Sequence, residues 1–379
     1  MGRVTVVVFS RIAHDPRVLR HVEALSKEHE VTTVAYGEYE HPGVHHVRIP
    51  DGTTHLPLLP HLVIGLMLGR FEWVLSRVPA VKFVRAVLRS TQPDLVFTND
   101  AMPLSVINTG SVKVHADFHE YAPREMEDDW RFRVLLQRLY VHICRSRLPL
   151  CSSVSTVSAG LAAEFHKEFG TTTTVIKNVR NYRMTHHPWG GRSESLRLVH
   201  TGLASKARKL ENMARAVSEL DGVELDMYLV RAPRQKLYYW RLTRIIRGFP
   251  NVRLCTPVPM SEIPELIAQY DAGLLVIYPS NFSLLHCLPN KLFDCMAASR
   301  PVVVGPNPDM ADFVREHRVG VVCPGFSAVE VKETIRALKV SDLQQLSDNA
   351  WTTAQKVTAQ AEAEELRRIL RHSIGITEE

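Results

Sequence analysis

Residues Leu288 to Gly305 read LPNKLFDCMAASRPVVVG, and this stretch decides how the chain folds. Pro289 precedes a mostly apolar segment of helical length, and Pro301 introduces a run of valines. This order is typical of a helix that leads into an interior strand of a parallel sheet. Lys291 lies in the first turn of that helix, where the backbone N–H groups and the helix dipole already attract anions. A cation at this position favours a binding site for a phosphate or diphosphate.

The same alternation of strands and helices extends through both halves of the chain. In the first half, strands are expected over 4–10, 31–36, 44–49, 94–100, 113–117, 154–158 and 173–177. The segment 180–195 interrupts the pattern, which resumes at residue 196. Two consecutive series predict two doubly wound α/β domains, with a ligand site in the cleft between them. The expected parts are an N-terminal domain over 1–182, a linker over 183–195, a C-terminal domain over 196–350 and a C-terminal helix over 351–379.

The composition indicates a globular protein with anionic partners. The chain of 379 residues is 45 % apolar and 23 % charged, and its formal net charge is +6. The positive excess is spread over both halves, whereas a nucleic-acid-binding protein more often concentrates it, so we expect anionic ligands and no nucleic acid. The six cysteines show no Cys-x-x-Cys spacing, which favours buried thiols of a cytoplasmic protein over a metal site. We expect neither a secretory leader nor a membrane-spanning helix.

Residues 55–90 combine apolar and basic side chains at helical spacing, and they allow two interpretations. The basic residues are Arg70, Arg77, Lys82, Arg85 and Arg89. Amphipathic helices of this kind can lie on an anionic lipid surface, here the inner face of the cell membrane. They can equally pack their apolar side, which includes Trp73, on the N-terminal sheet and leave a basic edge in water.

Five motifs in this chain resemble, in the same order, those of one enzyme family. They are HDPRVLRHVEAL (14–25), ADFHEY (116–121), VSTVSAGLAAEF (154–165) with VIKNV (175–179), LVHTGLASKARKLENMARAV (198–217) and LPNKLFDCMAASRPVVV (288–304). These motifs span nearly the whole chain. On them, the chain resembles the retaining glycosyltransferases of family four that carry a Pro-Asn-Lys signature. The resemblance implies the GT-B fold: two doubly wound Rossmann-like domains with a deep interdomain cleft and a C-terminal helix that crosses back to the first domain.

The resemblance also implies a function. Such enzymes are metal-independent hexosyltransferases that need no cofactor beyond the donor substrate, a nucleotide-diphosphate sugar. They move the sugar to an acceptor hydroxyl with retention of the anomeric configuration, in the biosynthesis of glycans, glycolipids or natural-product glycosides. The N-terminal domain would hold the acceptor, which can be a glycan, a lipid-linked sugar or a small molecule, and the C-terminal domain would hold the donor.

Seven residues are expected on the donor side. They are Gly202, Arg208, Lys209, His286, Asn290, Lys291 and Asp294. Lys291 and Arg208 would hold the diphosphate, and Asp294 would accept hydrogen bonds from the ribose hydroxyls. Two of these residues also have a purely structural interpretation: Asn290 as a helix cap and Asp294 as an acid on the helix surface.

On the acceptor side, the resemblance implies a catalytic role for His119. The matching histidine lies next to the reacting sugar carbon, where it orients groups by hydrogen bonding more than it abstracts protons. Asp117 and Glu120 would support it. The alternative is a structural histidine on a polar turn.

Three positions depart from the family pattern. His286 stands where the family has a glutamate, Leu203 where it often has an arginine, and Arg231 where it usually has a glycine. These departures keep two alternatives open. One is a non-catalytic GT-B protein that binds sugar nucleotides as a partner subunit, and the other is a GT-B sugar-nucleotide epimerase that needs no acceptor.

Overall fold

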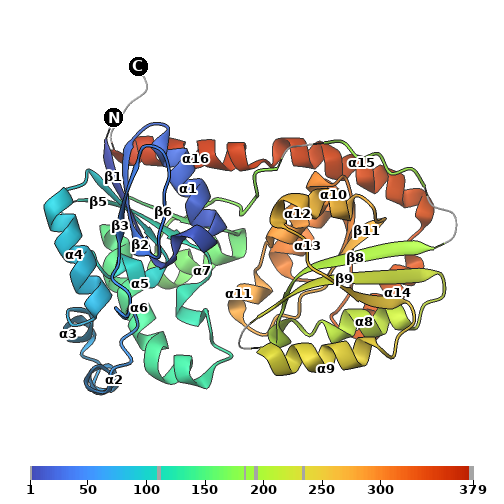
Figure 1. Ribbon diagram of the computed structural model, residues 1–379, viewed down its shortest axis with the longest axis horizontal. Helices are drawn as coiled ribbons and strands as arrows, with labels where there is room; N and C mark the ends of the chain where they lie inside the picture. Colours follow the sequence, from blue (N-terminus) through green and yellow to red (C-terminus); the bar gives the residue numbers. More distant parts are fainter. Residues whose placement is uncertain (1, 109–111, 183–184, 192–194, 233–234, 375–379) are drawn as a thin grey trace. The chain divides into compact units, whose positions relative to one another are not determined.

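The computed structural model describes residues 2–108, 112–182, 185–191, 195–232 and 235–374 (Figure 1). The chain forms two compact units. Unit 1 comprises Met1–Lys177, Asn281–Ser283 and Glu362–Glu379, and unit 2 comprises Asn178–Ser280 and Leu284–Ala361. Each unit is built on one parallel sheet, as the alternation of strands and helices predicts.

The sheet of unit 1 has seven parallel strands in the order β3-β2-β1-β4-β5-β6-β7. The strands are β1 (Arg3–Arg11), β2 (Glu30–Tyr36), β3 (Val44–Arg48), β4 (Leu95–Asn99), β5 (Lys113–Phe118), β6 (Ser153–Thr156) and β7 (Thr174–Val175). The strand order reverses between β1 and β4. In open α/β sheets, ligands bind outside the carboxyl ends of the strands at such a switch point.

Helices cover both faces of this sheet. They are α1 (Pro16–Ser26), α2 (Pro60–Met67), α3 (Phe71–Leu75), α4 (Pro79–Thr91), α5 (Ala101–Leu104), α6 (Gln137–Arg147), α7 (Ala159–Phe169) and α16 (Ala359–Ile374). Apolar side chains of α1 and α16 form one core with β1, while α2 to α7 contribute to a second core. Asp15 caps α1, because its carboxylate accepts a hydrogen bond from the backbone N–H of Val18 at 3.3 Å.

The C-terminal segment returns to unit 1, as expected for the fold. Leu366 and Leu370 of α16 are buried in the core of β1 and α1, and Arg371 forms an ion pair with Glu28. The segment expected as one helix over 351–379 is divided, however. A helix of unit 2, α15 (Val340–Lys356), ends at Val357, and the hydroxyl of Thr358 accepts a hydrogen bond from the N–H of Ala361 in the first turn of α16.

Unit 2 has six parallel strands in the order β10-β9-β8-β11-β12-β13. They are β8 (Leu196–Ala204), β9 (Val223–Arg231), β10 (Val252–Cys255), β11 (Ala272–Leu275), β12 (Val302–Val304) and β13 (Gly320–Val322). The further helices are α8 (Glu211–Ser218), α9 (Lys236–Ile246), α10 (Ile263–Ile267), α12 (Asn290–Ala297), α13 (Pro308–His317) and α14 (Ala328–Ala337), while the short helix α11 (Phe282–Leu285) begins with two residues of unit 1. Side chains of α8, α9 and α14 share one core, and those of α10, α12, α13 and α15 share the other. The opening stretch is therefore the helix α12 followed by the interior strand β12, as predicted.

The expected linker, 183–195, lies partly outside the described residues. Its described part packs on unit 2. His186 stacks on Trp351 with ring centroids 4.9 Å apart, and the indole N–H of Trp189 donates a hydrogen bond to Asp271 at 2.9 Å. These contacts tie 186–189 to the α15 side and the β11 end of that unit.

Candidate functional site

Gly202 is the point at which the two expected diphosphate-binding cations meet. It lies near the end of β8 with a φ of +146°, a conformation that side-chain-bearing residues rarely adopt. A Cβ at this position would lie 2.2 Å from Cε and 2.6 Å from Nζ of Lys291, and 3.6 Å from Nη1 of Arg208. A side chain at this position would displace the end of Lys291, and the same short distances show that Gly202, Arg208 and Lys291 form one cluster.

Lys291 occupies the first turn of α12 and is half-buried. Burial lowers the pKa of Lys291, and the nearby positive charge of Arg208 lowers it further, to about 7; the charge of Asp294 offsets only part of this. The buried His200 of β8 responds in the same way. Burial and the charges of Lys291 and Arg208 lower the pKa of His200 to about 3, so the imidazole is neutral. The cluster concentrates positive charge where water is scarce, and an anion would stabilise it.

The start of α12 offers further polar groups to such an anion. No side chain caps this helix at Pro289, so the interpretation of Asn290 as a helix cap is wrong. The side-chain oxygen of Asn290 is buried and has no hydrogen-bond partner among the described residues. A buried amide without a partner is costly, which points to a ligand that contacts it.

Asp294 lies one turn further along α12, and its side chain is fully buried. Its two carboxylate oxygens accept hydrogen bonds from Nη1 of Arg180 at 2.9 Å and from the hydroxyl of Tyr182 at 3.0 Å. The interpretation of Asp294 as an acid on the helix surface is therefore wrong. The carboxylate could accept further hydrogen bonds, but its complete burial leaves a ribose diol no access to it in this arrangement, so its role toward the ribose stays a prediction.

Two other expected donor residues have protein partners of their own. Nδ1 of His286 lies 2.8 Å from a carboxylate oxygen of Asp309, at the start of α13. The ammonium of Lys209 lies 3.4 Å from the centroid of the Tyr278 ring, above its face. Lys209 thus helps to position the turn that carries Arg208, and the structure does not bring it into the cluster at Gly202.

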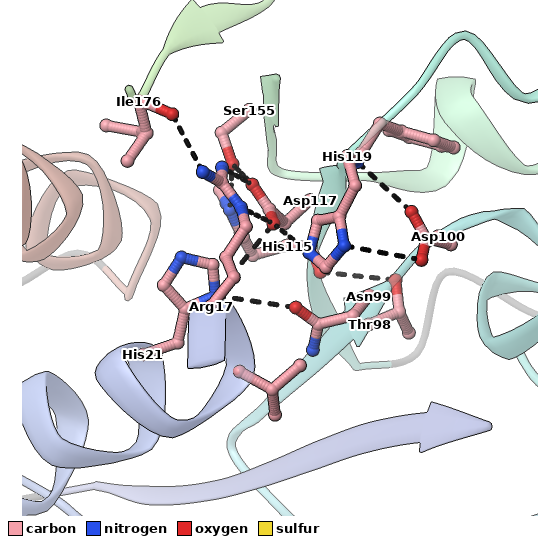
Figure 2. A network of polar contacts seen from close by, with 12 residues as sticks. Arg17, His21, Thr98, Asn99, Asp100, His115, Asp117, His119, Ser155 and Ile176 are labelled. Carbon is pink, nitrogen blue, oxygen red and sulfur yellow. Dashed lines mark hydrogen bonds and ion pairs between the residues drawn. The ribbon is translucent and has the colours of Figure 1, made fainter. Parts of the chain in front are cut away.

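The second group of expected residues surrounds Asp117, which ends β5 in unit 1 (Figure 2). Arg17 of α1 donates two hydrogen bonds to this buried carboxylate, from Nε at 2.8 Å and from Nη2 at 2.6 Å, and a third from Nη1 to the carbonyl of Ile176 at 2.9 Å. Burial raises the pKa of Asp117, but Arg17 and the imidazoles of His21 and His119 outweigh it and hold that pKa well below its usual range. Asp117 is therefore a buried anion held by a bidentate arginine.

His119 lies between two carboxylates of this cluster. Its Nε2 is 3.4 Å from Asp117 and its Nδ1 is 3.7 Å from Asp100, while its backbone N–H donates a hydrogen bond to Asp100 at 3.1 Å. Burial lowers the pKa of His119, but the charges of Asp100 and Asp117 outweigh it and raise the pKa to about 9. His119 is therefore protonated at neutral pH, and its side chain remains about a quarter exposed.

A chain of hydrogen bonds connects Asp117 to the C-terminal helix. Ser155 donates to Asp117 at 2.6 Å, Nε2 of His115 lies 2.9 Å from Ser155, Nδ1 of His115 lies 2.8 Å from Ser153, and Ser373 of α16 lies 2.9 Å from Ser153. Because the single hydroxyl proton of Ser155 goes to Asp117, His115 must donate from Nε2 and accept at Nδ1. Burial lowers the pKa of His115 to about 4, which keeps it neutral in this role.

Acidic residues near His119 differ from the expectation in burial. Glu120 is exposed directly after His119, and its predicted supporting role stays a prediction. Glu125 is half-buried, although the sequence places it in an acidic run typical of a solvated loop. Burial and the charges of Asp100 and Glu120 raise the pKa of Glu125 to about 8. His21, His115, Glu125, Arg180 and Tyr182 are among the residues near the two clusters that sequence reasoning missed, and only three-dimensional neighbours reveal them.

Among the described residues, no group of histidine, cysteine, aspartate and glutamate side chains has the spacing of a metal site. Within the same part of the chain, no helix combines the length and hydrophobicity needed to cross a bilayer.

Comparison with known proteins identifies the fold. No family model matches the chain, and no curated protein is similar to it in sequence. Sucrose-phosphate synthase from Thermosynechococcus elongatus is similar in structure over 100 % of both chains, with a TM-score of 0.75 and 11 % sequence identity. HepE from Anabaena, solved in complex with UDP-glucose, matches over 98 % of this chain and 100 % of its own, with a TM-score of 0.71 and 14 % identity.

A third solved structure extends this comparison. WaaG, a glycosyltransferase involved in lipopolysaccharide biosynthesis, matches over 97 % of this chain and 99 % of its own, with a TM-score of 0.66 and 15 % identity. Identities this low carry the fold alone. The two Rossmann-like sheets and the matches over full length confirm the prediction of a GT-B fold.

Proposed function

We propose that this chain is a glycosyltransferase that binds a nucleotide-diphosphate sugar at the cluster of Gly202, Arg208 and Lys291. The observation that carries the proposal is the convergence of two cations beside a glycine backbone at the start of α12. Burial and, after it, the positive charge of Arg208 lower the pKa of Lys291, and a diphosphate placed between the two cations would turn their repulsion into two charge-assisted contacts. The proteins named above include one solved with UDP-glucose, which supports the same class of donor.

The chemistry follows from the charge at this cluster. When the sugar leaves, negative charge develops on the diphosphate, and fixed cations together with the N–H groups of α12 would stabilise it without reorganisation. Among the described residues of the cluster, we find no pair of carboxylates arranged for a double displacement. We therefore propose that the acceptor attacks on the face from which the diphosphate departs, which gives retention.

We assign the acceptor side to unit 1, with His119 as the residue that contacts the reacting groups. Its raised pKa makes the imidazolium a hydrogen-bond donor at neutral pH, so it suits orientation of a hydroxyl or of the donor sugar better than abstraction of a proton. Asp117 fixes the imidazolium through its charge and is itself fixed by Arg17.

An anionic membrane surface is the proposed location of the acceptor. In 55–90, the large apolar side chains with exposed fractions of 41–67 % are Leu58, Leu59, Ile64, Met67 and Leu68. Trp73 is also exposed and stacks under Arg77, whose guanidinium carbon lies 4.1 Å from the ring centroid. Apolar side chains with basic neighbours are typical of surfaces that lie on anionic lipid.

Cosedimentation with vesicles tests this surface. Replacing Ile64, Met67 and Leu68 by serine should release the protein from vesicles that contain phosphatidylglycerol. The apolar area that these side chains would bury in the lipid would then be lost. Replacing Val329, which is 62 % exposed in unit 2, should leave the bound fraction unchanged. Equal binding of both variants would show that α2 does not contact the membrane.

Thermal denaturation with UDP, GDP and ADP tests the donor site. Saturation at 100 times the dissociation constant stabilises a folded protein by about 2.7 kcal/mol, so the correct base should raise the melting temperature above the other two. Release of a nucleoside diphosphate from a sugar nucleotide, in the presence of acceptors, then tests turnover.

A non-catalytic sugar-nucleotide-binding protein is the second candidate, and one observation favours it. His286 stands in place of the family glutamate and contacts Asp309, which leaves the donor sugar without the carboxylate expected there. Binding of a nucleoside diphosphate without release from any sugar nucleotide would support this candidate. Conversion of the donor sugar without an acceptor would indicate an epimerase instead.

A further inference from the structure

A recess on unit 2 has no part in the function described so far. It lies between the end of β9 and α9, and its volume is about 840 Å³. Among the described residues that line it, every charged one is a cation: Arg231, Lys236, Arg244 and Arg247. The two aromatic rings in its wall are Tyr239 and Trp240. A concave surface of this size and charge has the dimensions of a ligand site for an anion.

The two aromatic rings of the recess, Tyr239 and Trp240, differ in how closely a cation lies over them. The guanidinium carbon of Arg231 lies 4.7 Å from the centroid of Tyr239, so one face of that ring is covered by a cation. Trp240 is 58 % exposed, and the guanidinium carbon of Arg244 lies 5.9 Å from its centroid. The recess therefore presents a largely exposed indole in a wall that also carries the guanidinium groups of Arg231, Arg244 and Arg247, which can bind carboxylates in a bidentate manner.

The position of Arg231 places this recess next to the donor cluster on the same sheet. In the register of β8 and β9, Leu229 is paired with Gly202 and Arg231 with Ala204. The recess thus begins two residues beyond the partner of Gly202, on the α9 side. A glycine at 231, as in the resembling family, would lack the side chain that forms this end of the wall.

We propose that this recess binds an anionic oligosaccharide, such as a uronate-containing glycan, next to the donor site. The guanidinium groups would hold its carboxylates, and Trp240 would stack on the apolar face of one sugar ring. The proposal rests on the proposed function only in choosing a glycan as the anion. The glycan on which this enzyme acts would then be acidic. The recess of unit 2 would bind it in addition to the acceptor site of unit 1.

The shape of the recess argues against two other polyanions. Single-stranded nucleic acids need successive open rings on which bases stack, whereas here Arg231 already covers one of the two rings. A lipid surface is contacted by protruding apolar side chains, whereas the wall around Trp240 is concave and cationic.

Isothermal titration with tetragalacturonate tests this proposal, with the neutral maltotetraose and a thymidine tetranucleotide as further ligands. The wild-type protein should bind tetragalacturonate and should bind the other two at least about ten-fold more weakly. The double variant Arg244→Glu/Arg247→Glu should weaken tetragalacturonate binding by about ten-fold or more, since two charge-assisted contacts become repulsive.

Two further variants separate this proposal from the proposed function. Arg241→Glu changes an exposed arginine of α9 that does not line the recess, so it should leave the affinity within about two-fold. Lys291→Ala should weaken the binding of the nucleoside diphosphate and leave the binding of tetragalacturonate unchanged. No binding of tetragalacturonate, tighter binding of the tetranucleotide, or an equal loss in Arg241→Glu would overturn the acidic-glycan site without touching the donor site.

Discussion

In unit 1, the carboxylate of Asp117 accepts two hydrogen bonds from Arg17, and His119 lies between Asp117 and Asp100. In unit 2, the ammonium of Lys291 lies with the guanidinium of Arg208 beside the backbone of Gly202. The first cluster combines opposite charges, and its carboxylates raise the pKa of His119 to about 9. The second faces like charges, and burial with Arg208 lowers the pKa of Lys291 to about 7.

The two clusters therefore differ in whether their charges are balanced within the protein or by a bound ligand. Opposite charges that are buried together stabilise one another only while both are present. Like charges in a half-buried position favour the binding of a counter-ion, here a diphosphate. We therefore expect changes in unit 1 to affect folding and catalysis, and changes in unit 2 to affect ligand binding.

Breaking the ion pair in unit 1 should have the largest effect. Asp117→Asn leaves Arg17 buried without its anion, and we expect it to lower the free energy of unfolding by about 3–5 kcal/mol. Urea denaturation followed by circular dichroism measures this. Glu23→Gln, which removes an exposed pair with Lys27 in the same unit, should cost less than about 0.5 kcal/mol. A loss below about 1 kcal/mol in Asp117→Asn would mean that this pair does not hold the cluster together.

Removing the imidazolium should affect transfer and not donor binding. His119→Ala should lower the rate of sugar transfer by about 10- to 100-fold, as expected for the loss of one charge-assisted hydrogen bond. The affinity for the nucleoside diphosphate should stay the same. His45→Ala, at an exposed position of β3, serves as the control. Transfer at the full rate in His119→Ala would show that this cluster does not contact the reacting groups.

The pH dependence of donor binding should distinguish the two clusters further. The ammonium of Lys291 must be protonated to bind the diphosphate, and its pKa in the free protein is about 7. Affinity for the sugar nucleotide should therefore be constant well below pH 7 and fall by up to about ten-fold per pH unit above it. Lys291→Arg should remove this dependence, because arginine keeps its charge. A flat profile in the wild-type protein would contradict the role of Lys291.

Local patterns were sufficient to predict much of the fold. Pro289, the apolar segment after it and the valines after Pro301 predict α12 and β12, because each depends on neighbours in the sequence. The division of the C-terminal helix at Val357 was missed, because a valine and a threonine carry no strong breaking signal.

The partners of the candidate site residues could be predicted less well. Asp294 is held by Arg180 and Tyr182, which are more than a hundred positions away in the sequence, and no local pattern connects them. Glu125 stands in an acidic run of the sequence, which is typical of a solvated loop, and its burial depends on the fold around it. The motifs predict candidate residues, and the tertiary structure determines which of them meet.

The central claim is that Lys291 and Arg208 bind a diphosphate beside Gly202. Calorimetric titration of Lys291→Ala with whichever of UDP, GDP or ADP stabilises the wild-type protein most tests it directly, with Lys206→Ala as the exposed control from the same turn as Arg208. We expect Lys291→Ala to lose about 1.5–3 kcal/mol of binding free energy, while Lys206→Ala stays close to the wild-type protein. Equal affinity of Lys291→Ala and the wild-type protein would contradict it.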